Sequence, residues 1–248
     1  MVGVLVSILI AQVQIPDPLV AISKKYSVVV DVVTEPYTLR GWGYVVEGTV
    51  PKPEDLVKYV KIFASEWNRY PVSVIRSAKM KRIVIGAGIT LNKQVRAAVP
   101  AFESNTMVYD ATLGSYNEPY QRLVIHHEFF HMIDQVQGIM GKDPEWRALN
   151  PADFHYGTGG EKMRNLGAGI LTDKLPGVLT PYAMSAIEED KAELFGHLLV
   201  DREYVTGRMK ADPVIDAKAA LLKARLLKWD AGFNNEFWNS KAEAKNTK

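Results

Sequence analysis

The chain has 248 residues, of which 47% are hydrophobic and 23% charged, which is enough apolar material for one or two domains with a buried core. Its 30 basic and 28 acidic residues give a net charge of +2, so the charge balance calls for neither a nucleic acid nor an anionic membrane as partner. The absence of cysteine excludes disulfides, thiolate metal sites and cysteine nucleophiles, and any metal must therefore be held by His, Asp or Glu.

Residues 1–11, MVGVLVSILIA, form a short apolar run that allows two interpretations. One is a buried β-strand. The other is the core of a secretory signal without its basic start, since the first basic residue is Lys24. The second interpretation predicts a secreted or cell-envelope protein and leaves a cytoplasmic location open. No segment is long and apolar enough to predict a transmembrane helix.

The first half of the chain combines predicted strands with one amphipathic helix. The strand segments are rich in β-branched residues and are bounded by Gly or Pro. They lie at residues 26–33, 81–89 and 106–111, with a hairpin or loop at 38–49. A helix is predicted from Pro51 to Tyr70, because prolines and acids precede a helical apolar stripe. Residues 95–102 have no clear pattern.

The second half is predicted to be mainly helical. Its elements are a helix at 117–137 ended by Gly138, a long Gly-, Asn- and Pro-rich loop at 142–179 with at most short helices, a helix from Thr180–Pro181 to about Val200, a helix at 213–231, and a disordered tail after Ser240. A loop of that length is usually functional. Strands first and helices afterwards predict an α+β fold.

The sequence HEFFH at residues 127–131 is an H-E-x-x-H pattern on the long predicted helix. His127 and His131 are four residues apart on one helical face, so their imidazoles can converge on one metal ion. Glu128 lies at the edge of that face, within reach of a metal-bound water. The alternative is a pair of core histidines satisfied by hydrogen bonds. His126 is predicted to be a packing residue or to support a ligand, and His155 and His197 to be ordinary surface or core residues.

A catalytic zinc ion needs a third protein ligand, and the acidic run at residues 188–193 offers candidates. The helical face through Glu189 carries small residues that can pack closely against another helix, whereas the face through Glu188 carries bulkier ones. Glu189 is therefore the predicted ligand, and Glu193, one turn later, is predicted to orient a ligating histidine. The alternative is that the whole run is a solvated helix surface.

Two segments carry a family resemblance, namely His127–Asp134 (HEFFHMID) and Glu189–Glu193 (EDKAE). They resemble the motifs H-E-x-x-H-x-x-D and E-x-x-A-E of the gluzincin peptidases of the anthrax lethal factor type, the related Pro-Pro endopeptidases and a group of bacterial zinc-binding metallopeptidases. The resemblance spans residues 59–200. It implies a zincin-like metallopeptidase domain with a small mixed sheet, an active-site helix and a second glutamate-bearing helix. We place this domain at residues 49–248, after an N-terminal β extension at 1–48.

The resemblance also implies roles for individual residues. Tyr182, seven residues before Glu189, corresponds to a tyrosine that donates a hydrogen bond to the reacting oxyanion. On one helix that spacing is two turns, which predicts that both side chains point to the same side. Asp134 is implied to be structural or to support a ligand. Phe130 departs from the family, whose members usually carry glycine before the second histidine, and is expected to alter helix packing near the metal.

These parts predict a zinc-dependent endopeptidase with one Zn²⁺ per chain and a peptide or protein substrate. Zinc lowers the pKa of its water and polarises the scissile carbonyl. Glu128 takes the proton of the water and passes it to the leaving amine, and Tyr182 stabilises the oxyanion. The substrate is predicted to lie extended along an edge strand. The residues predicted for that strand are Thr106, Met107, Val108, Tyr109 and Asp110.

Two other functions stay open. A zinc hydrolase acting on something other than a peptide bond would have a closed small pocket in place of an extended groove. A catalytically weak binding protein on a metallopeptidase scaffold would need neither Glu128 nor Tyr182. The small basic cluster at residues 76–82 is predicted to be a solvated turn and not a nucleic-acid site.

Overall fold

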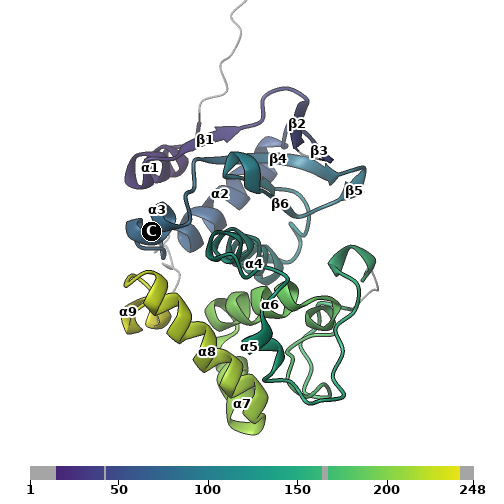
Figure 1. The fold of residues 1–248 in the computed structure, drawn as a ribbon. Coiled ribbons are helices and arrows are strands. Elements are labelled where there is room, and N and C mark those ends of the chain that lie inside the picture. Colours follow the sequence, from purple (N-terminus) through teal and green to yellow (C-terminus); the bar gives the residue numbers. More distant parts are fainter. Residues whose placement is uncertain (1–14, 42, 164–166, 241–248) are drawn as a thin grey trace, which may run out of the picture.

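A computed structural model describes residues 15–41, 43–163 and 167–240 (Figure 1). It has the predicted α+β architecture, with a mixed sheet in one half of the molecule and helices in the other. Residues 1–11 and the tail at 241–248, for which the sequence predicts a strand or signal and a disordered segment, lie outside the described residues. Within the described ranges, no helix combines the length and apolar character needed to cross a membrane.

The sheet follows the order β2-β3-β4-β7-β6, with β1 and β5 paired to β4 off this path. Its strands are β1 (Val29–Val32), β2 (Tyr37–Gly41), β3 (Tyr44–Thr49), β4 (Arg82–Leu91), β5 (Gln94–Val95), β6 (Ala98–Ala101) and β7 (Thr106–Asp110). β4 is parallel to β1 and β7 and antiparallel to β3 and β5, so the sheet is mixed as predicted. The predicted hairpin is β2–β3. The proposed boundary at residues 48 and 49 falls inside β3, and the division into two parts stays a prediction.

The prediction that Thr106–Asp110 is an edge strand was wrong. β7 pairs with β4 on one side and with β6 on the other, and all of its residues are buried. The sequence pattern of residues 95–102 is ambiguous, yet residues 98–101 form β6, which pairs with β7 and covers this side of it, while β5 pairs with β4. β6 is the edge strand, and it packs beside α4. Pro100 suits an edge position because proline has no N–H to give to a neighbouring strand.

The helices are α1 (Asp17–Tyr26), α2 (Pro53–Trp67), α3 (Val72–Ser77), α4 (Glu118–Gln137), α5 (Pro144–Arg147), α6 (Ile187–Val200), α7 (Arg202–Ala211), α8 (Pro213–Trp229) and α9 (Asn235–Asn239). The predicted helices α2, α4 and α8 are confirmed. The side chain of Asn117 accepts a hydrogen bond from the N–H of Tyr120 at the start of α4, and Gly138 ends the helix with φ 73°.

The helix predicted from Thr180 to Val200 is only partly present. Residues Tyr182–Ser185 form a 3₁₀ turn, η3, the backbone is extended at Ala186, and α6 begins at Ile187. The cause lies in the long loop. The N–H groups of Gly157 and Gly159 donate to the carbonyls of Met184 and Ser185, at 2.8 and 2.9 Å. In a continuous α-helix those carbonyls would accept from the residues four positions later, so the loop competes directly with the helix.

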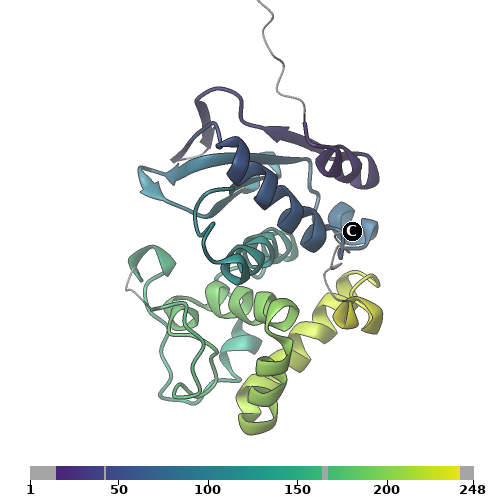
Figure 2. The same cartoon turned by 180° about the vertical axis from the view of Figure 1, so that it is seen from behind.

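Helix α4 lies between the sheet half and the helical half of the molecule in both views (Figures 1 and 2). On the sheet side, Phe129 packs on Trp67 of α2, with ring centroids 4.9 Å apart. On the other side, α6 approaches closely at Gly196, where an added Cβ would lie 2.7 Å from a methyl of Leu123 and 3.6 Å from the backbone nitrogen of His127. A glycine is needed there because the two helices leave no space for a side chain. This is the close packing that the small residues of the α6 face predict.

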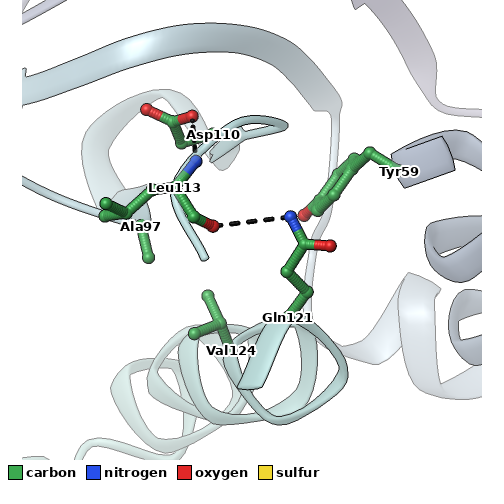
Figure 3. Close-up of a pocket in the computed structure, with 6 residues that line it drawn as sticks. All are labelled: Tyr59, Ala97, Asp110, Leu113, Gln121 and Val124. Carbon is green, nitrogen blue, oxygen red and sulfur yellow. Dashed lines mark hydrogen bonds between the residues drawn. The ribbon is translucent and has the colours of Figure 1, made fainter. Parts of the chain in front are cut away.

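The end of β7 is tied to the first turn of α4 (Figure 3). The carboxylate of Asp110 accepts hydrogen bonds from the N–H groups of Leu113 and Ile89, at 2.9 and 2.7 Å. The side-chain amide of Gln121 on α4 donates to the carbonyl of Leu113 at 3.4 Å. The carboxylate of the buried Asp110 is therefore hydrogen-bonded to backbone N–H groups. The connection fixes where α4 begins relative to the sheet.

Candidate metal centre and active site

Three donor atoms from two helices meet at one point between α4 and α6. The Nε2 atoms of His127 and His131 lie 3.3 Å apart, and Oε2 of Glu189 lies 3.0 Å from the first and 3.4 Å from the second. A tetrahedral zinc ion with bonds of about 2.0–2.1 Å separates its ligand atoms by roughly 3.3 Å. The three atoms therefore stand at the spacing that a shared zinc ion requires, and together they could hold one.

The position of these side chains follows from the helices that carry them. His127 and His131 are one turn apart on α4, as the spacing predicts, and Glu189 comes from the first turn of α6. The neighbouring carboxylate, Glu188, points towards Gly141 instead. Its Oε2 lies 3.6 Å from the position that a Cβ on Gly141 would take. The choice between the two glutamates by helical face agrees with this placement.

Glu193 lies one turn after Glu189 and faces the other nitrogen of His127. Its Oε1 is 3.0 Å from Nδ1 of His127, and the carboxylate is 4% exposed. Burial alone raises the pKa of Glu193, but the hydrogen bond from His127 and the attraction of the nearby His197 outweigh burial and hold the pKa down to about 2. A carboxylate that stays ionised fixes Nδ1 of His127 as the donor and leaves Nε2 directed at Glu189.

The charges of the site favour a divalent cation. Burial lowers the pKa of His127, yet hydrogen bonds and Coulomb attraction from Glu189 and Glu193 raise it well above its ordinary value. The carboxylates around His127 thus attract a positive charge strongly enough to hold a proton on a buried imidazole. The same negative charge suits a metal ion, and two imidazoles with one carboxylate are a common ligand set of catalytic zinc. The residues present fit zinc.

Glu128 lies beside the two histidines on α4 and is half-buried. Burial raises its pKa, and the neighbouring His127 and His131 only partly offset this effect. A raised pKa brings a carboxylate closer to the pH at which it can both take and return a proton. This environment would suit a group that exchanges a proton.

Tyr182 reaches the same place from the 3₁₀ turn η3. Its ring centroid is 6.0 Å from that of His127. A Cβ added to Gly160 would lie 2.4 Å from the phenol oxygen of Tyr182 and 2.5 Å from Oε1 of Glu189, so both groups and this glycine share one small space. Burial and then the nearby carboxylates raise the pKa of Tyr182 far above its ordinary value, so the phenol keeps its proton for donation. The two-turn helix expected to align Tyr182 with Glu189 is absent.

Two further residues of the His127–Asp134 segment contact α6 next to the site. Asp134 is buried and forms an ion pair with the ammonium group of Lys191 on α6, with a shortest N–O distance of 2.6 Å, which joins α4 to α6. Phe130 packs on Phe195 with ring centroids 5.0 Å apart and is 1% exposed. The bulky side chain therefore occupies the core between the helices.

Sequence reasoning missed two residues that shape the site. Gly160 is buried against Tyr182 and Glu189, and the only signal for it is the glycine-rich stretch at residues 157–160 within an unusually long loop. Thr180 is predicted as the cap of an α-helix, but its hydroxyl accepts from Ala183 in the 3₁₀ turn and donates to Glu193. No local pattern indicates that second bond.

Comparison with known proteins supports the fold. No protein-family model matches the chain, and no curated protein matches it significantly. A solved structure described as "a putative zinc-binding metallo-peptidase" from Bacteroides caccae is similar over 87% of this chain and 85% of that chain, with a TM-score of 0.54 and 20% sequence identity. The chain shares the fold of that protein. The predicted α+β architecture with a small mixed sheet is confirmed at this level.

Proposed function

We propose that the chain is a zinc-dependent endopeptidase of the gluzincin type, related to the anthrax lethal factor group. The proposed zinc ligands are His127, His131 and Glu189, with Glu128 as general base and Tyr182 as oxyanion donor. The observation that carries the proposal is the set of distances from 3.0 to 3.4 Å among three donor atoms from α4 and α6. The fold of the Bacteroides caccae structure supports it.

The proposed chemistry assigns one task to each group. Zinc held there would supply a Lewis acid that lowers the pKa of a water molecule and polarises the scissile carbonyl. Glu128, whose pKa is raised by burial, accepts the proton of the attacking water and returns it to the leaving amine. Tyr182 keeps its proton and donates a hydrogen bond to the negative oxygen that develops on the carbonyl carbon. Glu193 holds the ring of His127 in place.

We infer that the substrate lies along β6, which replaces β7 as the proposed binding strand. The N–H of Asp110 donates to the carbonyl of Ala97, so the pairing of β6 with β7 uses that residue and every second one after it. By this alternation the main-chain groups of Ala98 and Pro100 face the outer side of the sheet. Ala98 is buried, at 2% exposure, so the group that remains open to an extended peptide beside α4 is the carbonyl of the half-buried Pro100.

The test combines metal analysis with peptide cleavage. Protein purified without chelator is expected to contain about one zinc per chain. It is expected to cleave a library of unstructured peptides, to lose this activity in a chelator such as 1,10-phenanthroline, and to regain it when zinc is restored. A protein that holds zinc but cleaves no member of the library, while it hydrolyses small esters or amides, would support the non-peptidase hydrolase instead.

A further inference from the structure

The hydroxyl of Thr180 touches two parts of the proposed active site at once. Thr180 is fully buried, at 0% exposure, between the long loop and the turn η3. Its Oγ1 donates to Oε2 of Glu193 at 2.6 Å and accepts from the N–H of Ala183 at 3.1 Å. One side chain thus bonds to a carboxylate on α6 and to the backbone of the turn before it.

Each of these two hydrogen bonds connects Thr180 to a neighbour of a group with a proposed role in the site. Oε1 of Glu193, the other oxygen of the same carboxylate, lies 3.0 Å from Nδ1 of His127. Ala183 follows Tyr182 directly in the chain, and the N–H of Tyr182 is itself held by the carbonyl of Ala168 at 2.7 Å. The orientation of a zinc-binding imidazole and that of the phenol therefore depend on the same hydroxyl.

His197 competes with His127 for the carboxylate of Glu193, and the hydroxyl of Thr180 opposes this competition. Nε2 of His197 lies 3.6 Å from Oε2 of Glu193, too far for a good hydrogen bond but close enough for strong attraction. Burial lowers the pKa of His197, yet Asp201 and Glu193 together raise it to about 9, so its ring is positively charged at neutral pH. Without the hydroxyl, the carboxylate of Glu193 is free to rotate towards His197 and away from His127.

We propose that Thr180 is a positioning residue that couples the orientation of His127 to that of Tyr182. The proposal rests on the proposed function, because it assumes that His127 binds zinc and that Tyr182 donates to the oxyanion. Thr180 itself touches neither the metal nor the substrate. Its effect on zinc passes through Glu193, and its effect on turnover passes through the turn η3.

The first arm of the test measures zinc affinity, by competition with a chromophoric chelator, and needs no activity. Thr180→Val keeps the shape of the side chain and removes the hydroxyl, and we expect zinc binding to weaken by about 10-fold, the low end for groups that support a ligand. Thr180→Ser keeps the hydroxyl and is expected to bind zinc like the wild type. In a Glu193→Gln background, Thr180→Val should add little further loss, because both changes break one connection.

The second arm measures turnover with zinc at saturation. Thr180→Val should lower kcat with little change in KM, Thr180→Ser should restore kcat, and the effect of Thr180→Val should shrink in a Tyr182→Phe background. If Thr180→Val does not fold, Thr180→Ala, which removes the hydroxyl and adds no bulk, carries the same expectations.

The outcomes separate the two proposals. A zinc affinity that is equal in the wild type and Thr180→Val, or equally reduced in Thr180→Val and Thr180→Ser, overturns the role of Thr180. A wild type that binds zinc but cleaves no peptide overturns the proposed function, and the zinc arm then decides on the hydroxyl alone. A wild type that binds no zinc overturns both.

Discussion

His126 and His127 are neighbours on α4, and both are buried, with 0% and 6% exposure. His126 faces the sheet side, where Nδ1 pairs with the phenol of Tyr70 at 2.7 Å and Nε2 with Glu66 at 2.9 Å. His127 faces α6, where Nδ1 meets Glu193 and Nε2 meets Glu189. Burial lowers the pKa of His126 despite its carboxylate, whereas two carboxylates raise the pKa of His127.

Both histidines are buried, so burial does not distinguish them. They differ in whether a ring nitrogen points to the same place as other donor atoms. Each ring nitrogen of His126 has its own partner, and these partners belong to a packed network that includes Arg69 and Arg122. Nε2 of His127 points to a place where a second imidazole and a carboxylate also point. A buried histidine with two separate partners is a packing residue, and a buried histidine whose outer nitrogen meets other donors is a candidate ligand.

The largest effect expected is the loss of zinc on replacement of His127. His127→Ala removes one of the three donors and should abolish both zinc binding and peptide cleavage. His126→Gln, the matched control, should keep one zinc per chain and lower only the thermal stability, because it disturbs the buried pair with Glu66. Metal analysis and thermal unfolding of both variants give the answer. Full zinc content in His127→Ala would reverse the assignment of the two histidines.

Replacement of Glu128 should affect chemistry and leave metal binding intact. We expect Glu128→Gln to retain zinc and the fold while turnover falls by about 100- to 10,000-fold, since the variant has no base to accept the proton. Zinc content and kcat, measured on the same preparation, test this expectation. Loss of zinc with retained activity would make Glu128 a ligand and not a base.

Tyr182→Phe removes one hydrogen-bond donor and keeps the ring. We expect unchanged zinc content, stability within about 1 kcal/mol of the wild type, and a fall in kcat of roughly 100- to 1,000-fold with little change in KM. Steady-state kinetics on a cleaved peptide provide the measurement. If turnover stays close to the wild type, Tyr182 is a packing residue of the turn η3.

The two neighbouring glutamates of α6 offer a matched pair for the third ligand. Glu189→Ala should weaken zinc binding strongly, by about 100-fold or more, because it removes a donor atom. Glu188→Ala should leave zinc affinity close to the wild type, since Glu188 lies beside Gly141. Chelator competition on both variants compares them directly. Similar losses in the two variants would contradict the separation by helical face.

The smallest effect concerns how the stability of the fold depends on acid through Glu66 and its partners His126 and Arg69. Burial raises the pKa of Glu66, but hydrogen bonds from His126 and Arg69 outweigh burial and lower the pKa from 4.5 to about 2. A depressed pKa stabilises the fold above pH 4.5, and this contribution is lost as the pH falls from 4.5 through 2. Urea unfolding of zinc-free protein should therefore show a shallower acid dependence for Glu66→Gln than for the wild type. Parallel curves would exclude this linkage.

The sequence predicts those elements whose signals are local. Helix α4 has its cap at Asn117, its glycine at 138 and its paired histidines within one segment, so its bounds and the face that carries the paired histidines follow from spacing alone. By contrast, α7 (Arg202–Ala211) is polar and lacks an apolar stripe, and β6 is a short strand that is defined by its pairing with β7. Such elements are fixed by contacts with distant residues, which no local pattern records.

The same distinction holds within the candidate site. The H-E-x-x-H helix and Glu189 are found by spacing, because each relation lies within one helix or one helical face. The placement of Tyr182 depends on bonds from Gly157 and Gly159 to η3, and these segments are far apart in the chain. The resemblance indicates the residue, but the helix geometry used to explain its position was wrong. The bond from Thr180 to Glu193 joins two elements in the same way and has no sequence signal.

The bonds from the long loop to η3 also give Tyr182 a support that the three donor atoms do not share. The donor atoms lie on α4 and α6, which pack directly on each other, whereas the turn that carries Tyr182 is also bonded to residues 157–159 through the carbonyls of residues 184 and 185. If the proposed roles hold, a disturbance confined to residues 157–159 would therefore displace the proposed oxyanion donor and leave the three proposed zinc ligands in place.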